Sequence, residues 1–264
     1  MSFLRNFAAE TLRLHVFRRH IKTIMSEELN QPTIEDKRPR LWLVAPGREF
    51  VRPYFERLMP EYRLTDSPDD ADAAVMISST DIYDVTEGCL YNELTLVDRS
   101  SAWSAAETGF ANAAVTRGLA APILRAADII ATGMTGLPRK MAEQIYRGTF
   151  IGVSGNEAER SFIHAVDLPD AARIAISHPD IYNVCARTAT RINDLADALA
   201  WRIAQKRVFD IKPRWYKWIF GRKKLDEMCR TLTFSSEKIC STGDFNPVDV
   251  VQYLKTHKYD DDSL

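Results

Sequence analysis

Glycine is scarce in this sequence, at 11 of 264 residues, or about 4%, where proteins of ordinary composition have about 7%. No apolar run approaches the roughly 20 residues that cross a bilayer, so we expect no membrane-spanning segment. An excess of positive charge is also missing, because 35 Lys and Arg face 36 Asp and Glu, which excludes a globally basic nucleic-acid-binding protein. The 45% of apolar residues predict a globular chain, either one large domain or a domain with a small appendage.

The cysteines follow no recognisable pattern. They stand at Cys89, Cys185, Cys229 and Cys240. No Cys-x-x-Cys pair and no metal-ligand spacing with histidine is present, so we expect no metal site. Scattered cysteines fit buried thiols in a reducing compartment better than a disulfide framework. Cations interrupt the apolar N-terminus too often for the core of a signal peptide, and we therefore expect a cytoplasmic protein.

The first forty residues differ from the rest of the chain. Residues 1–25 contain five Lys or Arg and one acid, with apolar residues recurring at steps of three and four. This pattern predicts an amphipathic basic helix, followed by a polar linker up to residue 40. Such a helix can pack on its own domain, bind a second copy or a partner subunit through residues 1–30, or lie on an anionic membrane surface.

From residue 41 onward, short apolar strands alternate with helices. The strands are expected at 41–45, 62–65, 70–77, 121–124 and 182–184, and the helices at 50–59, 101–117, 138–147, 167–178, 190–206 and 246–257. Pro46-Gly47 marks a turn after the first strand. This alternation predicts an α/β fold with a parallel sheet and helices on both faces.

Several segments, in order, resemble one family. They are Ile77-Ser-Ser-Thr-Asp-Ile-Tyr83, Arg117-Gly-Leu-Ala-Ala-Pro-Ile-Leu-Arg125, Arg160-Ser-Phe-Ile-His-Ala-Val-Asp-Leu168, Tyr182-Asn-Val184, Phe234-Ser-Ser-Glu-Lys238 and Gly243-Asp-Phe-Asn-Pro247. Together they resemble the extended short-chain dehydrogenase/reductase family, of the NAD-dependent epimerase/dehydratase type. The resemblance implies a dinucleotide-binding Rossmann-like domain and a smaller C-terminal domain that grips a nucleotide-sugar. We therefore expect residues 41–150 to form a shortened Rossmann-like domain, and residues 151–264 its remaining elements with a small C-terminal domain.

The loop that would hold the cofactor departs from the family pattern. A Rossmann fingerprint needs glycines so that the backbone can approach the pyrophosphate. Here the three glycine positions fall on Pro46, Glu49 and Arg52, and Gly47 is out of register. A carboxylate at Glu49 repels phosphate, and the side chains of Arg48 or Arg52 could partly offset this repulsion but would still crowd the phosphate. Gly47 and Ser78 are the remaining candidates for contacts with a cofactor. We nevertheless expect that the protein binds no cofactor, or that it binds NAD(P) only if it has retained the activity of the family.

The catalytic residues implied by the resemblance are also incomplete. The family uses a tyrosine as general acid/base, with a lysine one helical turn later and a Ser or Thr hydroxyl. The sequence has no Tyr-x-x-x-Lys, and the expected pair falls on Arg99 and Trp103 or on Trp103 and Glu107. Ser79 is the only retained catalytic candidate, and its alternative role is to close a strand end.

The stretch between the first strand and this serine is short. Ser79 stands only 35 positions after Val44, from which we infer that one or two βα units are missing. Asp66 follows the second strand, where an acid could bind a ribose, although its Thr-Asp-Ser-Pro context is typical of a turn.

The residues that the resemblance implies for substrate binding are better preserved than those for the cofactor. Arg160 matches the arginine that contacts nucleotide-sugar phosphates in the family, and a guanidinium suits phosphate because it binds in a bidentate manner. Arg125, at a strand end, is either a second ligand or half of a core ion pair. We expect His164 and Asp167 to be structural, with Asp167 capping a helix.

A second basic region lies near the C-terminus. Residues 200–240 hold eleven Lys or Arg and four acids, and aromatic residues alternate with cations over 213–224. The favoured reading packs these aromatics under the C-terminal domain and leaves the cations in solvent. The other readings are contact with a membrane surface and, less favoured, binding of single-stranded nucleic acid.

Three functional hypotheses follow. The first is a catalytically impaired epimerase/dehydratase-like protein that binds a nucleotide-sugar-like ligand or a protein partner. The second is an active NAD(P)-dependent nucleotide-sugar epimerase or dehydratase that uses Ser79 with Tyr83 or Tyr91. The third is a membrane-associated scaffold that uses residues 1–25 and 213–224.

Overall fold

The computed structural model describes residues 36–85, 90–206 and 209–257. The helix expected at 1–25, Cys89 and the acidic end of the chain lie outside the described residues. All elements named below belong to the unit that begins at Arg38.

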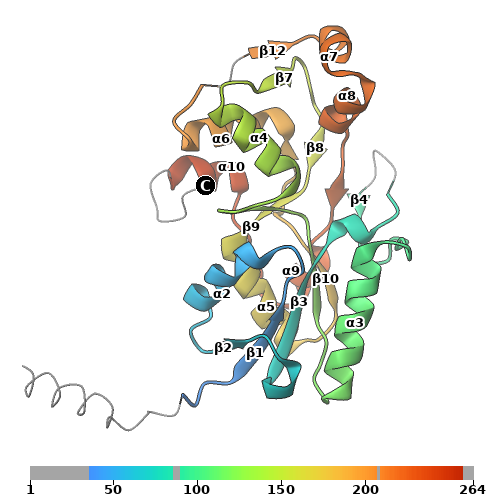
Figure 1. Cartoon of the computed structure of the whole chain (residues 1–264), viewed down its shortest axis with the longest axis vertical. Helices are drawn as coiled ribbons and strands as arrows, with labels where there is room; N and C mark the ends of the chain where they lie inside the picture. Colours follow the sequence, from blue (N-terminus) through green and yellow to red (C-terminus); the bar gives the residue numbers. More distant parts are fainter. Residues whose placement is uncertain (1–35, 86–89, 207–208, 258–264) are drawn as a thin grey trace, which may run out of the picture. The chain divides into compact units, whose positions relative to one another are not determined.

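The main sheet has five strands, all parallel (Figure 1). They are β1 (Arg40–Val44), β2 (Arg63–Thr65), β3 (Ala73–Ser79), β5 (Ile123–Ala126) and β10 (Ile181–Val184), in the order β10-β5-β3-β1-β2. The expected α/β class with a parallel sheet is confirmed.

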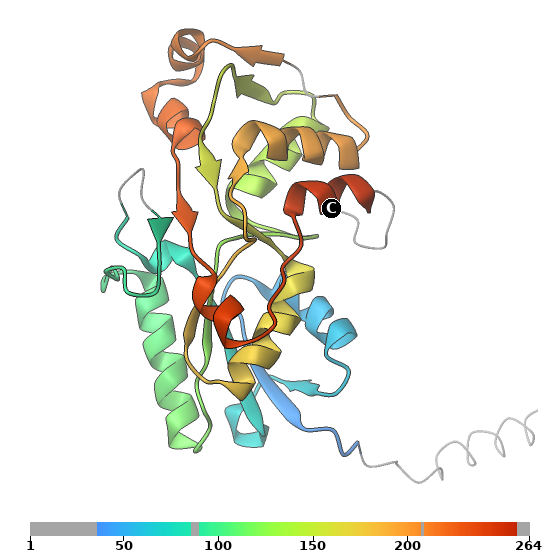
Figure 2. The ribbon, with the colours of Figure 1, turned by 180° about the vertical axis from the view of Figure 1, so that it is seen from behind.

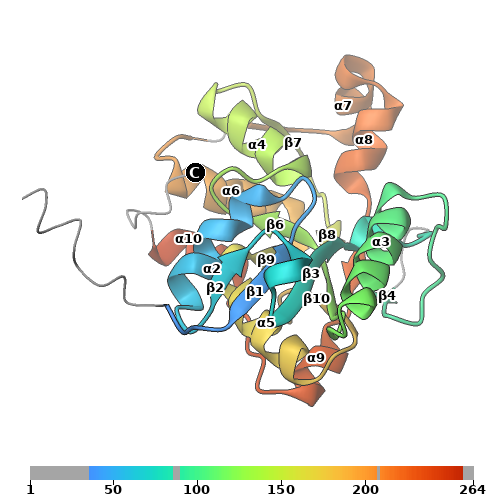
Figure 3. The same cartoon turned by 60° about the horizontal axis from the view of Figure 1, so that its bottom comes forward.

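Alternating side chains make both faces of the sheet apolar. Leu41 and Leu43 of β1 face one core, whereas Trp42 faces the other, where its ring lies 5.1 Å from that of Phe110. The helix α3 (Ala102–Thr116) covers this second face. The first face is covered by α2 (Arg52–Leu58), α5 (Leu168–Ser177) and α9 (Glu237–Thr242) (Figure 3). A sheet covered on both sides explains why the strands are almost uniformly apolar.

The crossover from β1 to β3 is short. It contains the 3₁₀ helix η1 (Glu49–Val51), α2, the edge strand β2 and the 3₁₀ helix η2 (Pro68–Asp70). The strand β3 then pairs directly with β1, with Val44 opposite Met76. The strand that carries Ser78 and Ser79 is therefore the immediate neighbour of β1.

A second apolar core lies outside the sheet. It is enclosed by α4 (Gly136–Tyr146), α6 (Ile192–Arg202), α7 (Pro213–Phe220), α8 (Arg222–Cys229) and α10 (Val250–Thr256) (Figure 2). The described residues also form four two-stranded pairs: β6 (Asp128–Ile130) with β9 (Phe162–His164), β7 (Ile151–Val153) with β12 (Phe209–Ile211), β8 (Glu159–Arg160) with β11 (Thr190–Arg191), and β4 (Leu90–Tyr91) with β13 (Thr233–Phe234). The helices α7, α8 and α9 were not expected from the sequence.

Asp167 does not have the capping role expected for it. Its carboxylate accepts no hydrogen bond from the first turn of α5 and instead accepts the backbone N–H of Val248, at 3.3 Å from both oxygens. His164 is the residue that caps, because its Nδ1 accepts the N–H of Val166 at the start of the 3₁₀ helix η4 (Ala165–Asp167). Asp167 thus connects α5 to the segment before α10.

Asp167 predicts a pH-dependent stability. Burial raises the pKa of Asp167 to about 7, from 3.8, the hydrogen bond from Val248 opposes this rise, and Asp170 adds to it. Because the folded state holds this proton more tightly than the unfolded chain, the stabilising contribution is complete below about pH 4 and is lost as the pH rises through about 7. Asp167→Asn keeps an acceptor and cannot ionise. We expect a larger free energy of unfolding than wild type at pH 8, and a difference that shrinks toward pH 5, in urea denaturation.

The matched control is Asp244→Asn, at an exposed position. The free energy of unfolding of this variant should depend on pH as that of the wild type does. An Asp167→Asn variant that is less stable than wild type at pH 8 would contradict this account of the site.

Candidate functional site

The natural place for a ligand is the carboxyl edge of the parallel sheet. In open α/β sheets, ligands bind outside the carboxyl ends of the strands, where the strand order reverses. That point lies between β1 and β3, because β2 is on one side of β1 and β3 is on the other.

The turn after β1 shapes this edge. The N–H of Arg48 donates to the carbonyl of Ala45 at 2.9 Å, and Gly47 has a φ of +64°, as in a type II turn with Pro46 at its second position. The carboxylate of Glu49 accepts the N–H of Gly47 at 3.1 Å. This N–H, which a phosphate group would need as a donor, is therefore already bonded to an anion of the chain itself.

Arg48 covers the ends of the neighbouring strands. Its guanidinium donates to the carbonyl of Ser78 at 2.7 Å and to Oγ of Ser79 at 2.9 Å, and it lies 5.0 Å from the ring centre of Trp103. The residue is only 8% exposed, and this burial lowers the pKa of the guanidinium, while Asp81 and Asp128 oppose the shift.

Of the two arginines near the loop, Arg48 lies at this edge of the sheet, whereas Arg52 lies elsewhere. Arg52 forms ion pairs with Asp66 at 2.5 Å and Glu56 at 3.1 Å on the surface. In the structure, Asp66 is an ion-pair partner of this arginine.

A dinucleotide does not fit this edge in the Rossmann manner. The pyrophosphate would need the N–H that Glu49 accepts, and it would meet the side chain of Arg48 above the ends of β3 and β5. No glycine other than Gly47 stands in the turn to let the backbone approach.

The helix face where the family carries tyrosine and lysine is structural in this protein. Arg99 precedes α3, so Trp103 and Glu107 are the i, i+4 pair that faces the sheet. Glu107 accepts two hydrogen bonds from Arg125, at 2.9 and 2.8 Å, and a third from Oγ of Ser78 at 2.6 Å. The side chains of Arg125 and Glu107 are 6% and 9% exposed, so Arg125 is in a buried ion pair.

Tyr83 extends this buried network. Its hydroxyl accepts from Arg125 at 3.2 Å and donates to Oδ1 of Asn183 at 2.6 Å. Burial raises the pKa of Tyr83, which opposes its use as a base at neutral pH. Tyr91 is also buried, with its ring 5.8 Å from that of Phe234. These positions give no support to proton transfer by Ser79 with either tyrosine.

A group of charged residues surrounds Asp128, which sequence reasoning missed. Burial and the nearby Asp81 raise the pKa of Asp128 to about 6, while Arg160, Arg48 and Lys140 oppose this rise. Both acids follow strands of the main sheet, β3 and β5, within two residues. The sequence held a signal for this group, because acids that directly follow buried parallel strands meet at one edge of the sheet.

Arg160 lies beside this group on β8. Its Nη2 donates to the carbonyl of Glu227 at 2.8 Å and its Nε to that of Arg230 at 3.3 Å, so it holds the end of α8. Burial lowers the pKa of Arg160, with Asp128 opposing and Arg230 reinforcing this effect.

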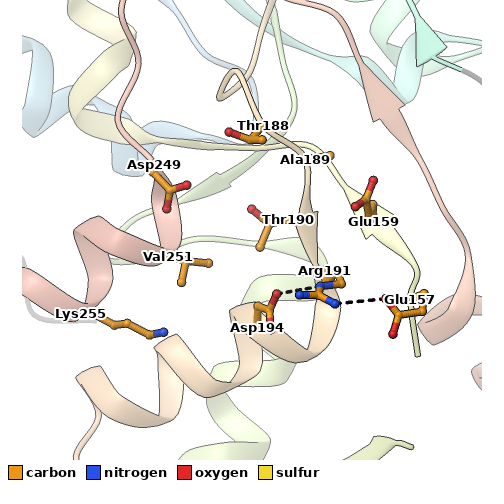
Figure 4. A pocket seen from close by; sticks show the side chains of 10 residues that line it. All are labelled: Glu157, Glu159, Thr188, Ala189, Thr190, Arg191, Asp194, Asp249, Val251 and Lys255. Atoms are coloured by element: carbon orange, nitrogen blue, oxygen red, sulfur yellow. Dashed lines mark hydrogen bonds and ion pairs between the residues drawn. The ribbon is translucent and has the colours of Figure 1, made fainter. Parts of the chain in front are cut away.

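A separate cavity of about 580 Å³ lies between the β8–β11 pair, α6 and α10 (Figure 4). Its charged lining consists of Glu157, Glu159, Asp194, Asp249, Arg191 and Lys255. Arg191 is already paired with Glu157 at 3.1 Å and Asp194 at 3.0 Å. The excess of carboxylates makes this cavity unsuitable for a phosphate-bearing ligand.

The fold is that of the extended short-chain dehydrogenase/reductase epimerases, as the resemblance implied. RMD from Pseudomonas aeruginosa, complexed with NADPH, is similar over 82% of this chain and 95% of its own, with a TM-score of 0.61 and 17% identity. UDP-N-acetylglucosamine 4-epimerase from Bacillus cereus matches over 82% and 97%, with a TM-score of 0.58 and 14% identity.

UDP-glucose 4-epimerase from Thermotoga maritima, with UDP-glucose, matches over 80% of this chain and 71% of its own, with a TM-score of 0.54 and 17% identity. No family model matches the sequence, and no curated protein matches it either. The likeness therefore concerns the fold, and the chemistry depends on the residues described above.

The buried ion pair generates a stability prediction. Glu107→Leu leaves the guanidinium of Arg125 buried without a counter-charge, so we expect a loss of about 3–5 kcal/mol in the free energy of unfolding. The double variant Glu107→Leu with Arg125→Met should be more stable than the single one, because no charge remains buried. Chemical denaturation measures both.

The exposed i, i+4 pair Arg139–Glu143 provides the control, and Glu143→Ala should cost less than about 0.5 kcal/mol. A Glu107→Leu loss as small as that of Glu143→Ala would show that the buried pair does not stabilise the fold.

Proposed function

We propose that this protein binds a nucleotide-sugar-like anion and does not carry out NAD(P)-dependent catalysis. The observation that carries the proposal is the position of Arg48, whose guanidinium lies on Ser78, Ser79 and Trp103 at the edge where a cofactor would bind. The carboxylate of Glu49 on the N–H of Gly47 supports it independently.

The occupied helix face supports the loss of catalysis. A general acid/base must reach the substrate and change its protonation state near neutral pH. Trp103 has no titratable group, and the carboxylate of Glu107 accepts three hydrogen bonds from Arg125 and Ser78. A hydroxyl at Ser79 alone supplies no base.

The charge group around Asp128 supports an anionic ligand. Arg160, Lys140 and Arg48 surround Asp128 closely enough to affect its ionisation. Lys140 pairs with the carboxylate of Glu227 at 3.5 Å and Arg160 donates to the carbonyl of Glu227 at 2.8 Å, so an ammonium and a guanidinium lie at the same residue, a combination that suits a diphosphate. The Thermotoga maritima enzyme of similar fold was solved with UDP-glucose, which makes nucleotide-sugars the first class to test.

The absence of cofactor binding is directly measurable. Calorimetric titration of the purified protein with NAD(H) and NADP(H) should give no saturable binding up to about 1 mM, because Arg48 and Glu49 occupy the phosphate position. A Kd in the micromolar range for either cofactor would refute the proposal, whatever the activity of the protein.

Ligand binding tests the role of Arg160. We expect UDP- or dTDP-sugars to bind to wild type, and Arg160→Ala to weaken binding about 10- to 100-fold through the loss of charge-assisted hydrogen bonds. The control is Arg191→Ala, because the charge of Arg191 is already neutralised by Glu157 and Asp194. This variant should bind the sugars with the affinity of the wild type. No saturable binding across a panel of these sugars would exclude the ligand class.

Asp128 gives the same site a pH signature. With a pKa of about 6, its carboxylate is charged at pH 7.5 and becomes neutral below pH 6, so wild-type affinity for an anion should increase as the pH falls through 6. Asp128→Asn should bind more tightly than wild type at pH 7.5 and show little change between pH 5 and 8. If the affinity of both proteins changed with pH in the same way, the ligand would bind away from Asp128.

A further inference from the structure

The helix α7 has an apolar side that the described chain leaves at least half exposed. Tyr216 and Phe220, at i and i+4, pack inward with ring centres 4.7 Å apart, and Tyr216 is buried. Trp215, Trp218 and Ile219, at i, i+3 and i+4, share another side of the helix. They are 51%, 79% and 52% exposed. The favoured sequence reading, in which the aromatics of this region pack beneath the domain, therefore holds for Tyr216 and is wrong for the two tryptophans.

The fold keeps this side of α7 open. Figure 1 shows α7 with α8 and β12 beside it and no other labelled element over its outer side, and Figure 2 agrees. Gly221, with a φ of +86°, turns the chain between α7 and α8, so α8 does not continue the helix. Exposed large apolar side chains gathered on one short helix are unusual in a surface that contacts only water.

Cations surround these apolar residues. Lys212, Arg214, Lys217, Arg222, Lys223 and Lys224 lie in a stretch of thirteen residues, 212–224, that contains no acid. Arg222 has a distant partner in Asp226, at 3.6 Å. Within the described part of the chain, Lys212, Lys217 and Lys223 take part in no ion pair. The charge around α7 is therefore available to an external anionic surface.

The side-chain geometry favours a lipid surface over nucleic acid. The rings of Trp215 and Trp218 are 6.3 Å apart and meet edge to face at 86°, so they do not form two parallel platforms for successive bases. Ile219 adds an aliphatic group that has no role in base stacking. Tryptophan beside lysine and arginine is the composition found where proteins contact the headgroup region of a bilayer.

We propose that α7 and the start of α8 form a docking surface for anionic membranes, with Trp215, Trp218 and Ile219 entering the headgroup region and the surrounding cations binding acidic lipids. This surface, defined by residues 212–224, is separate from the Asp128 group and does not depend on the ligand proposed for it. It places the protein at the membrane as a peripheral component.

Sedimentation of the full chain with vesicles tests the proposal. Vesicles of phosphatidylcholine with about 30% phosphatidylserine should bind the protein at about 0.1 M salt, with weaker binding at about 0.5 M and little binding to phosphatidylcholine alone. Trp215→Ser with Trp218→Ser should lower the partition coefficient about tenfold or more. Lys212→Gln, Lys217→Gln and Lys223→Gln together should lower it similarly and flatten the salt dependence.

Matched controls separate this surface from general effects. Leu94→Ser with Leu96→Ser removes two exposed apolar side chains elsewhere, and Arg63→Gln, Arg99→Gln and Arg147→Gln removes three exposed cations elsewhere. Both sets should bind vesicles as wild type does, and circular dichroism should show the same fold for all variants.

Three outcomes would overturn the proposal. One is a double tryptophan variant that binds vesicles as strongly as the wild type does. This includes the case in which vesicle binding is lost only when residues 1–30 are deleted. The second is no binding of the full chain to anionic vesicles at low salt. The third is displacement of vesicles by a single-stranded oligonucleotide that binds 212–224 more tightly at the same salt, which would make this a nucleic-acid surface.

Discussion

The guanidinium of Arg125 and the carboxylate of Glu107 meet in an ion pair that is almost completely shielded from water. Two charges in such a place are stable only when their remaining hydrogen-bonding groups are satisfied, and Ser78 and Tyr83 do this. The pair joins α3 to β5, and its hydrogen-bond partners come from β3 and from the segment that follows it. Together with the packing of Phe110 on Trp42, this contact fixes the position of α3 on the sheet and with it that of Trp103 beside Arg48.

The same contact decides what the site can do. On the side of α3 that faces the sheet, the carboxylate of Glu107 is bound to Arg125 and Ser78. Arg48 and Glu49 act on the loop after β1 in a comparable way, because the guanidinium of Arg48 lies on the end of β3 and the carboxylate of Glu49 accepts the N–H of Gly47. The fold is similar to that of solved epimerases, and side chains of the protein itself lie at the edge of the sheet where a ligand is expected.

Much of the sheet could be predicted because its strands are short apolar runs that end in turn residues. The strands at β1, β2 and β10 were placed within one or two residues, and the short interval before Ser79 indicated a reduced crossover. The helices α7 and α8 were not predicted, although the apolar residues of α7 recur at helical spacing, because each helix has only eight residues and the sequence reading treated 213–224 as a basic and aromatic stretch. The role of Asp167 was also missed, because its partner Val248 lies 81 residues away in the sequence.

The sequence by itself determined the fold class, the loss of the glycine loop and the absence of the tyrosine–lysine pair, because each of these depends on residues that are local in the chain. It also indicated that a glutamate would oppose phosphate binding after β1. Only the tertiary structure decided that Arg48, and not Arg52, covers the sheet edge, that Arg125 is bound to Glu107, and that the tryptophans of α7 face outward. Those outcomes depend on which strands and helices become neighbours, and residue spacing along the chain does not encode that directly.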